Sequence, residues 1–271
     1  MRHTTAVAGP TVADQILAAR RRRSWRFRLV FVLTWVVLIG GLILSQALNG
    51  NFSTDFVAEW APYILAGTET TVIVSVVSIA LAIFFALAGA LGRLSPRATI
   101  YATATLYVSL VRGTPLLMQI LFVYLALPEI IPAAAKVPAF VLGIFALAFN
   151  YGAYMTEIFR AGIEAVPRGQ REAAEALGMP EGLVMRRIVL PQATRIVIPA
   201  IGNEFIAMLK DSSLVSVIAV QELLWRARRA GAQDFNTFEA LTVAALVYWG
   251  LTIVFSLFQD RLEKRMARGD R

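Results

Sequence analysis

The chain has 271 residues and a formal net charge of +8, and 58% of its residues are hydrophobic while 16% are charged. Soluble domains carry about 25% charged residues, so this composition and the mean hydropathy of +0.65 exclude an ordinary soluble domain. The chain has no cysteine, which excludes disulfides and thiol chemistry. We therefore expect an all-α polytopic membrane protein.

Six membrane spans are predicted, because six apolar runs reach the roughly 18 residues that a bilayer crossing requires. The runs cover residues 29–48, 62–91, 98–127, 137–161, 196–224 and 238–258. The second run is long for one span, so we expect it to be tilted or to extend beyond the bilayer. The first span is expected to be retained, because no small-residue cleavage site follows it.

Basic residues predict the orientation of the chain. Six arginines lie just before the first span, and basic segments beside spans stay in the cytoplasm. Alternation then places both basic tails, residues 1–28 and 261–271, and the loop at about 164–195 in the cytoplasm. We interpret this charge as contact with anionic membrane lipid rather than with nucleic acid. Arg226, Arg228 and Arg229 fall on the outer side and depart from this pattern.

No catalytic or metal-binding motif is found. The sequence contains neither a Gly-x-x-x-x-Gly-Lys phosphate loop nor a Gly-x-Ser-x-Gly elbow. Its one histidine, His3, offers no zinc pattern. Catalysis by carboxylates alone remains open, but no predicted soluble domain is large enough for an active site. We expect the chain to move or bind a molecule within the membrane.

Polar residues within the second span share one helical face, because they are three or four positions apart. They are Thr68, Thr71, Ser75 and Ser78. Small side chains allow helices to approach closely, so this stripe predicts a packing seam. A seam that also borders a polar pathway is the alternative.

The third and fourth spans contain charged residues. Gly113 and Pro115 follow Arg112, so the third helix is predicted to be kinked or unwound there. Arg112 either serves function or extends its side chain to the cytoplasmic membrane surface. Glu157 and Arg160 are three positions apart in the fourth span and are expected to pair, either for function or only for structure.

The fifth span carries the strongest intramembrane signal. Its polar residues are Asn203, Glu204, Lys210, Asp211, Ser212 and Ser213. Intramembrane charges are costly and mark functional sites by default, so these side chains are expected to face the bundle interior or a water-filled path. A neutralised structural ion pair between Lys210 and Asp211 is the alternative.

The polar loop between the fourth and fifth spans is predicted to form two short helices. Residues 171–177 are strong helix formers, and Gly178 suits the position after a helix end. Pro180 suits the first turn of the next helix, and Pro191 is expected to end that helix. By spacing alone, the loop is either a linker or a docking site for another protein.

Several motifs resemble those of one transporter family. "EAAEALGM", followed by "IVLP", resembles the EAA loop of ABC-importer membrane subunits. The motifs "RGTPLLMQ" (112–119), "YMTEIFRAGIEAVPRGQREAAEALGM" (154–179), "LPQATRIVIPAIGNEF" (190–205) and "LKDSSLVSVI" (209–218) are similar to those of the polar amino-acid uptake permeases, the histidine/glutamine/arginine type. The resemblance extends from about residue 66 to the C-terminal region. Two positions depart from the family pattern. Glu204 stands where glutamine is common, and Ala161–Gly162 stands where a Gly-Gly pair is frequent.

This resemblance implies a type I ABC importer permease core of five transmembrane helices, at about 62–260, and one additional N-terminal helix, 29–48. It implies a second permease subunit, identical or related, and two cytoplasmic ATPase subunits that use ATP and Mg. It also implies an external amino-acid-binding protein and a prokaryotic cytoplasmic membrane. The chain itself is then a permease without a cofactor rather than an enzyme.

Site residues follow from the same resemblance. The ATPase-coupling loop is expected to contain Glu172, Ala173, Ala174, Gly178, Met179 and Pro191. The substrate path or gate is expected to contain Arg112, Thr114, Glu157, Asn203, Glu204, Lys210, Asp211, Ser212 and Ser213. An ion-coupled secondary transporter is the main alternative, although it predicts paired repeats that the sequence lacks. A non-transporting membrane scaffold is a further alternative.

Overall fold

The computed structural model describes residues 12–48, 52–233 and 235–266. This part of the chain consists of helices and turns and contains no strand, as the sequence predicts. His3, Arg268 and Arg271 lie outside the described residues, and side chains are described from Leu29 onward.

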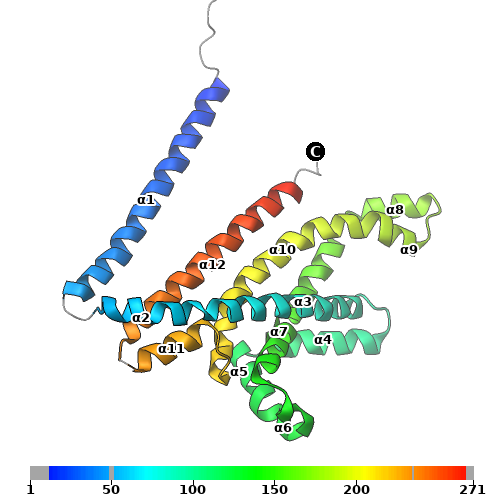
Figure 1. Ribbon diagram of the computed structural model, residues 1–271. Coiled ribbons are helices and arrows are strands. Elements are labelled where there is room, and N and C mark those ends of the chain that lie inside the picture. Colours follow the sequence, from blue (N-terminus) through cyan, green and yellow to red (C-terminus); the bar gives the residue numbers. More distant parts are fainter. Residues whose placement is uncertain (1–11, 49–51, 234, 267–271) are drawn as a thin grey trace, which may run out of the picture. The chain divides into compact units, whose positions relative to one another are not determined.

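The chain divides into two units, which are residues 1–54 and 55–271. In the first unit, helix α1 (Val12–Leu48) contains the predicted first span, and none of residues 29–48 is buried. The helix begins at Val12, so it also includes the second half of the segment predicted as a basic tail. The second unit contains all remaining helices (Figure 1).

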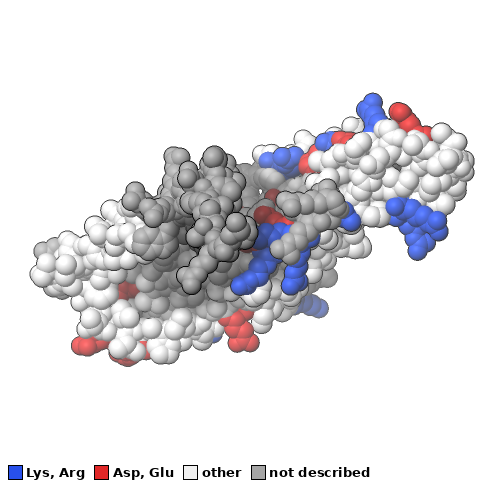
Figure 2. All heavy atoms as spheres, turned by 90° about the horizontal axis from the view of Figure 1, so that it is seen from above, with Lys and Arg blue, Asp and Glu red and all other residues white. Residues whose placement is uncertain are grey.

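Apolar helices long enough to cross a membrane confirm four of the predicted spans. Among the described residues they are Leu29–Leu48, Thr54–Arg93, Ala139–Glu164 and Thr237–Met266. The second of these is formed by α2 (Thr54–Leu65) and α3 (Gly67–Arg93), and the other two in the second unit are α7 (Ala139–Glu164) and α12 (Thr237–Met266). Where Figure 2 shows described residues, most of the surface carries neither acidic nor basic side chains.

The predicted third span is broken where the sequence indicates. Helix α4 (Ala98–Arg112) ends at Arg112, and α5 (Leu116–Leu121), the π-turn η1 (Phe122–Ala126) and α6 (Leu127–Ile130) follow at an angle of 106°. Pro115 has an extended backbone, with φ −64° and ψ 137°. Its ring cannot donate a backbone hydrogen bond and disfavours a helical Thr114, so the helix cannot continue. A short 3₁₀ turn, η2 (Pro132–Lys136), leads to α7.

The prediction of a continuous fifth span over residues 196–224 is wrong. Helix α10 (Leu190–Asp211) ends before the 3₁₀ turn η4 (Ser212–Ile218), and α11 (Leu223–Gln233) is a separate helix. The Ser212 hydroxyl donates to the Leu209 carbonyl at 2.8 Å, and Ala219 adopts a left-handed backbone with φ 62°. Short polar side chains that bond their own backbone end helices in this way. Arg226, Arg228 and Arg229 therefore belong to a short helix between spans.

Pro191 does not end the helix that begins after Pro180, contrary to the prediction. Helix α9 (Glu181–Val184), the π-turn η3 (Met185–Val189) and α10 follow one another with helical backbone angles at each junction. The Leu190 N–H donates to the Met185 carbonyl, five residues back. This wider turn immediately precedes Pro191, and such turns accommodate a proline that cannot join the regular hydrogen-bond ladder.

The core of the second unit lies between α3 and α7, which make its most extensive interhelical contact. Thr71, Ser75 and Ser78 of the predicted seam are completely buried, and the Ser78 hydroxyl donates to the Ile144 carbonyl of α7 at 3.3 Å. At Gly89, an added Cβ would lie 2.2 Å from the Thr156 hydroxyl. The small side chains therefore set the close approach of these two helices. Helix α12 packs against α10 and α11.

Candidate functional site

The loop between α7 and α10 is a helical hairpin, formed by α8 (Arg168–Ala176) and α9, that projects at one end of the second unit (Figure 1). Gly178 lies between the helices with φ +75°. Its N–H donates to the Glu175 carbonyl at 2.9 Å, and the Met179 N–H donates to the Ala174 carbonyl at 3.1 Å. These two bonds define a Schellman motif, which satisfies the last carbonyls of a helix and favours glycine at the left-handed position.

The inner face of the hairpin is packed. Ala174 is 3% exposed and forms a cluster with four buried residues, to which Met179 adds its side chain. The members of the cluster are Val166, Ala174, Val184, Val189 and Ala193. Arg171 donates to the Ile163 carbonyl at 2.7 Å and so ties α8 to the end of α7. The hairpin is thus held as one piece with α7 and α10.

The outer face of the hairpin is presented to its surroundings. Glu172, Ala173 and Pro191 are exposed, and Leu177 at the tip is 83% exposed. A single exposed leucine at the end of a rigid polar hairpin offers an apolar contact with a charged rim. This surface can seat in a groove of a partner, whereas a simple linker would not need a packed inner face.

The break after α4 is held by side chains from distant elements. The Gln119 amide donates to the carbonyls of Val111 and Thr114, at 2.7 and 3.1 Å, and to the Thr114 hydroxyl at 2.8 Å. Asn150 of α7, which is 4% exposed, donates to the Gln119 carbonyl oxygen at 3.0 Å. Gln119 therefore satisfies carbonyls that the helix end leaves without an intrahelical partner.

Two aromatic residues of α7 lie against the predicted path residues. The Arg112 guanidinium lies 5.3 Å from the centre of the Tyr154 ring, within the range of a cation–π contact. The Tyr151 hydroxyl donates to the Asp211 carboxylate at 2.8 Å. α7 therefore contacts residues from both broken helices.

The remaining predicted path residues differ in exposure. Thr114, Asn203 and Lys210 are exposed, Glu204 and Ser213 are half-buried, and Ser212 is completely buried. The Ser212 hydroxyl bonds its own helix end and is not presented at the surface. The exposed residues lie on α10 and at the α4 break, where a second subunit or a water-filled path can reach them.

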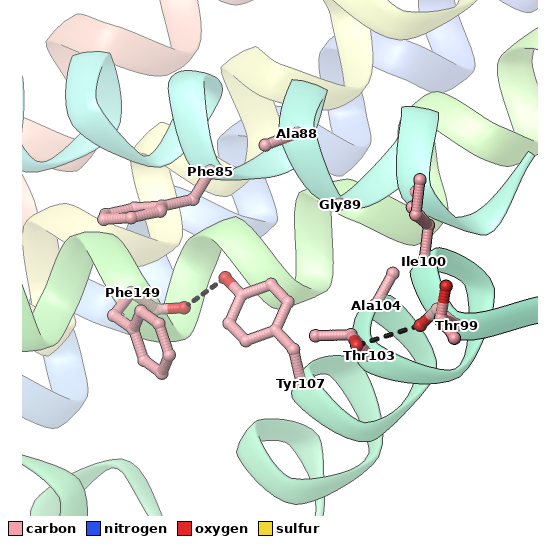
Figure 3. Close-up of a pocket in the computed structure, with 10 residues that line it drawn as sticks. Phe85, Ala88, Gly89, Thr99, Ile100, Thr103, Ala104, Tyr107 and Phe149 are labelled. Carbon is pink, nitrogen blue, oxygen red and sulfur yellow. Dashed lines mark hydrogen bonds between the residues drawn. The ribbon is translucent and has the colours of Figure 1, made fainter. Parts of the chain in front are cut away.

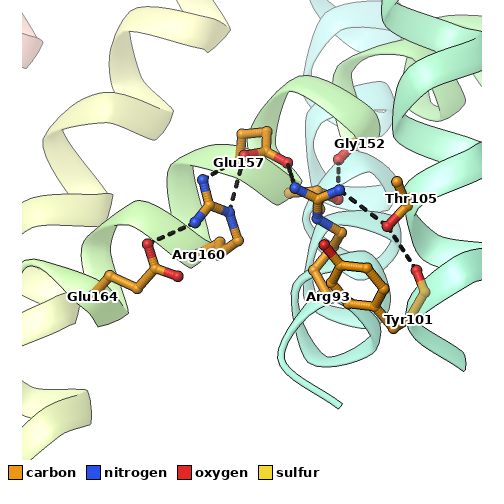
Figure 4. A network of polar contacts seen from close by, with 8 residues as sticks. Arg93, Tyr101, Thr105, Gly152, Glu157, Arg160 and Glu164 are labelled. Carbon is orange, nitrogen blue, oxygen red and sulfur yellow. Dashed lines mark hydrogen bonds and ion pairs between the residues drawn. The ribbon is translucent and has the colours of Figure 1, made fainter. Parts of the chain in front are cut away.

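Glu157 lies in an ion-pair network rather than at an open surface (Figure 4). Its carboxylate is 3.3 Å from Arg93 at the end of α3 and 2.9 Å from Arg160. Arg160 also pairs with Glu164 at 2.6 Å, and Arg93 donates to the Thr105 hydroxyl of α4 at 3.0 Å. The predicted pair of Glu157 and Arg160 is present, and the network joins α3, α4 and α7.

Glu222 was not among the predicted site residues, although it lies near the end of the predicted fifth span. Its side chain is 0% exposed and accepts hydrogen bonds from the N–H groups of Leu224 and Trp225, at 3.0 and 2.8 Å. It also accepts from the hydroxyls of Tyr248 and Thr71. Burial raises the pKa of the Glu222 carboxyl, while these hydrogen bonds oppose the shift. An acidic residue just before an amphipathic helix was the available signal.

Known proteins match most of the chain. Residues 78–268 match the family described as "Binding-protein-dependent transport system inner membrane component". The chain is 36% identical over 209 residues to the "Arginine transport system permease protein ArtQ" of Bacillus subtilis (strain 168), covering 77% of this chain and 94% of that protein. It is 35% identical over 204 residues to the "Putative glutamine transport system permease protein GlnP" of Rickettsia typhi, covering 75% and 93%.

Solved structures match the same region. One, described as "Crystal structure of an amino acid ABC transporter with histidines", has a TM-score of 0.74 and 36% identity, and covers 79% of this chain and 100% of that chain. A chain of the MetNI methionine ABC transporter in an inward-facing conformation has a TM-score of 0.59 over 79% of this chain and 97% of its own. At 16% identity, the second match shows the likeness of fold alone.

Proposed function

Because the chain belongs to the family of binding-protein-dependent transport system inner membrane components, we propose that it is the membrane-spanning subunit of an ATP-driven importer of a polar amino acid. Its fold is that of a type I ABC importer permease, and its relatives are permeases rather than enzymes. The names of those relatives, which include an arginine and a glutamine permease, support a polar amino acid as the substrate.

The α8–α9 hairpin is the observation that carries this proposal. Its inner face is fixed to α7 and α10, so a force applied at Glu172, Ala173 or Leu177 moves those two helices as well. Two cytoplasmic ATPase subunits would seat on the hairpins of two permease subunits. ATP and Mg would be bound by the ATPases, and this chain would transmit their closure to the spans.

The substrate path is proposed to run beside the two broken helices. Arg112 and Lys210 supply positive charge for an amino-acid carboxylate, and Glu204 supplies negative charge for an amino group. The contact of Arg112 with Tyr154 positions the Arg112 guanidinium against α7, and the contact with Tyr151 does the same for the Asp211 carboxylate, next to Lys210. A second permease subunit, identical or related, would complete the path, and an external binding protein would deliver the substrate.

The chain is a multi-pass protein of the inner membrane, and we propose that both of its ends lie in the cytoplasm. This orientation follows from the arginines before the first span. It also places the α8–α9 hairpin on the side where ATP is available. Helix α11, with Arg228 and Arg229 exposed, then lies on the outer side between two spans.

A transport assay that compares the wild type with the Glu172→Lys variant tests the proposal. The chain is copurified from its native membrane in mild detergent, its partners are identified by mass spectrometry, and the complex is reconstituted in liposomes. We expect an ATPase to copurify with the chain and the wild-type complex to show ATP-driven uptake. Glu172→Lys should reduce this uptake, while its ATP hydrolysis continues. Asp260→Lys is the matched control, because Asp260 is exposed on α12 and lies outside the hairpin.

Three results would contradict the proposal. Uptake driven by an ion gradient without ATP would favour a secondary transporter. Unchanged uptake in Glu172→Lys would remove the hairpin from the coupling pathway. If the chain copurified with other proteins but gave no uptake under either driving force, the scaffold alternative would be favoured instead.

A further inference from the structure

A shallow groove with a volume of about 440 Å³ runs between α3 and α4 (Figure 3). It is lined by Ala88 and Gly92 of α3, by Thr103 and Tyr107 of α4, and by Phe149 of α7. We name it the α3–α4 groove. None of these residues belongs to the α8–α9 hairpin or to the proposed substrate path, so the proposed transport mechanism does not account for the groove.

The lining is mostly apolar, and the hydroxyls of two of its residues bond within the protein. The Tyr107 hydroxyl donates to the Phe149 carbonyl at 2.7 Å, and the Thr103 hydroxyl donates to the Thr99 carbonyl at 2.9 Å (Figure 3). Ala88 and Gly92 leave the α3 wall low, since neither has a long side chain. The groove therefore offers rings and methyl groups to an apolar occupant rather than hydrogen bonds to a polar one.

The stretch from Arg97 to Tyr107, which includes the groove's lining on α4, has about the length of one bilayer leaflet. From Arg97, just before α4, to Tyr107 there are ten helical steps of about 1.5 Å, or roughly 15 Å. The hydrocarbon core of a bilayer is about 30 Å thick, so this length equals about half of it. An acyl chain that begins at the membrane surface beside Arg97 would end near the Tyr107 ring.

The charge just before the α4 wall of the groove is positive. Arg97 is exposed and lies two residues before Thr99, which lines the groove. The turn from Leu94 to Arg97 contains no acidic residue. Arg93 is held by Glu157 and Thr105, so Arg97 is the arginine of this turn that extends from the surface. A cation at the membrane surface attracts anionic lipid headgroups.

We propose that the α3–α4 groove binds one anionic phospholipid, with an acyl chain along Thr103 and Tyr107 and the phosphate at Arg97. Under the orientation proposed above, this lipid belongs to the cytoplasmic leaflet. A second protein chain would fill an apolar groove equally well, but it would not require an arginine at the membrane surface and a length that matches one leaflet.

Lipid binding to the purified full-length chain tests this inference. The protein is delipidated in mild detergent, and phosphatidylglycerol or phosphatidylcholine is added back while bound lipids are counted by native mass spectrometry. We expect phosphatidylglycerol to bind more tightly than phosphatidylcholine. Arg97→Gln should weaken the binding of phosphatidylglycerol about fivefold, because one basic residue near the membrane surface changes the affinity for an anionic lipid by about that factor. The binding of phosphatidylcholine should be unchanged. Arg261→Gln, on exposed α12, is the matched control.

A second pair of variants tests the groove itself. Thr103→Trp fills the groove and should remove both lipids, whereas Ala102→Trp, an exposed neighbour that does not line it, should bind both as the wild type does. Circular dichroism of each variant checks that the helices are retained. Equal phosphatidylglycerol binding by the wild type, Arg97→Gln and Thr103→Trp would overturn the inference. So would a Thr103→Trp chain that loses a protein partner but keeps its lipid.

The outcome is separate from that of the transport proposal. Lipid counting needs neither ATP nor a substrate, so a chain that failed to transport amino acids would still give a clear lipid result. Conversely, a wild-type chain that transports normally but binds phosphatidylglycerol no more tightly than phosphatidylcholine would overturn the lipid site alone.

Discussion

The α8–α9 turn and the α4–α5 break both interrupt a helical path with a glycine, yet they are held in different ways. Gly178 adopts φ +75°, and two backbone hydrogen bonds within the same turn close the motif. Gly113 keeps a right-handed backbone, with φ −87°, and the break is closed by Gln119 and by Asn150 of another helix. The first interruption is local, whereas the second depends on a partner that lies 31 residues away from Gln119.

The largest expected effect is that of proline at the local turn. Gly178→Pro removes the N–H that donates to Glu175 and forces φ to about −65°, so it disrupts the Schellman motif. We expect this to destabilise the hairpin by about 3 kcal/mol or more. Uptake should be lost, while the spans remain folded because they do not depend on this turn. ATP-driven uptake and the helical content of the purified chain measure the two parts of the prediction.

A milder pair of substitutions at the hairpin isolates the backbone angle. An added Cβ meets nothing within 4 Å at either Gly178 or Gly182, so packing does not distinguish the two positions. Gly178→Ala should destabilise the hairpin by about 1 kcal/mol, since only a left-handed position penalises alanine. Gly182→Ala lies in helical α9 and should stabilise it slightly. Equal effects on hairpin proteolysis would show that φ at Gly178 is not the controlling feature.

The break at Gly113 should respond to substitutions at a distance. Gln119→Leu leaves the Val111 and Thr114 carbonyls and the Asn150 amide without their partner, so we expect a loss of about 1–3 kcal/mol in stability. Asn150→Leu alone should cost less, because Gln119 still holds the α4 end. Thermal unfolding in detergent measures both, and the double variant should cost less than the sum of the two. Strict additivity would show that the two side chains act independently.

This contrast also explains what the sequence could predict. The hairpin was predicted in outline because glycine, proline and strong helix formers act on their neighbours. The break after Arg112 was predicted for the same reason, but Gln119 was not assigned a role, since its partner Asn150 lies on another helix. The end of α10 was misplaced because an apolar run conceals a turn that two serines and a left-handed Ala219 create.

The candidate site shows the same difference between features set by local sequence and features set by distant contacts. The residues of the coupling loop were located by a local motif, and the structure places all of them on or beside one hairpin. The path residues were chosen for their place in the family motifs and for the cost of polar groups within the membrane. These criteria do not separate exposed Lys210 from Glu157, which Arg93 and Arg160 neutralise. The pairing of Glu157 with Arg93 was not predicted, because the contact of α3 with α7 is a property of the tertiary structure.

The smallest expected effect is at the start of α11, which is held both by local and by distant hydrogen bonds. Glu222 caps α11 through two nearby N–H groups and also accepts from Thr71 of α3 and Tyr248 of α12. Burial raises the pKa of its carboxyl above the ordinary value of 4.5. A raised folded-state pKa stabilises the protein fully below the unfolded-state pKa, and this contribution is lost as the pH rises through the folded-state pKa. The wild type should therefore lose some stability as the pH increases from below 4.5.

Glu222→Gln removes this titration while keeping an oxygen that can accept from Leu224 and Trp225. We expect the variant to differ from the wild type by no more than about 1 kcal/mol at acid pH, and to gain relative to it as the pH rises. Thermal unfolding across this range measures the difference, with Glu181→Gln, an exposed acid of α9, as the control. A constant difference between variant and wild type would mean that the pKa of Glu222 is the same in the folded and unfolded protein, so that its four hydrogen-bond donors offset its burial.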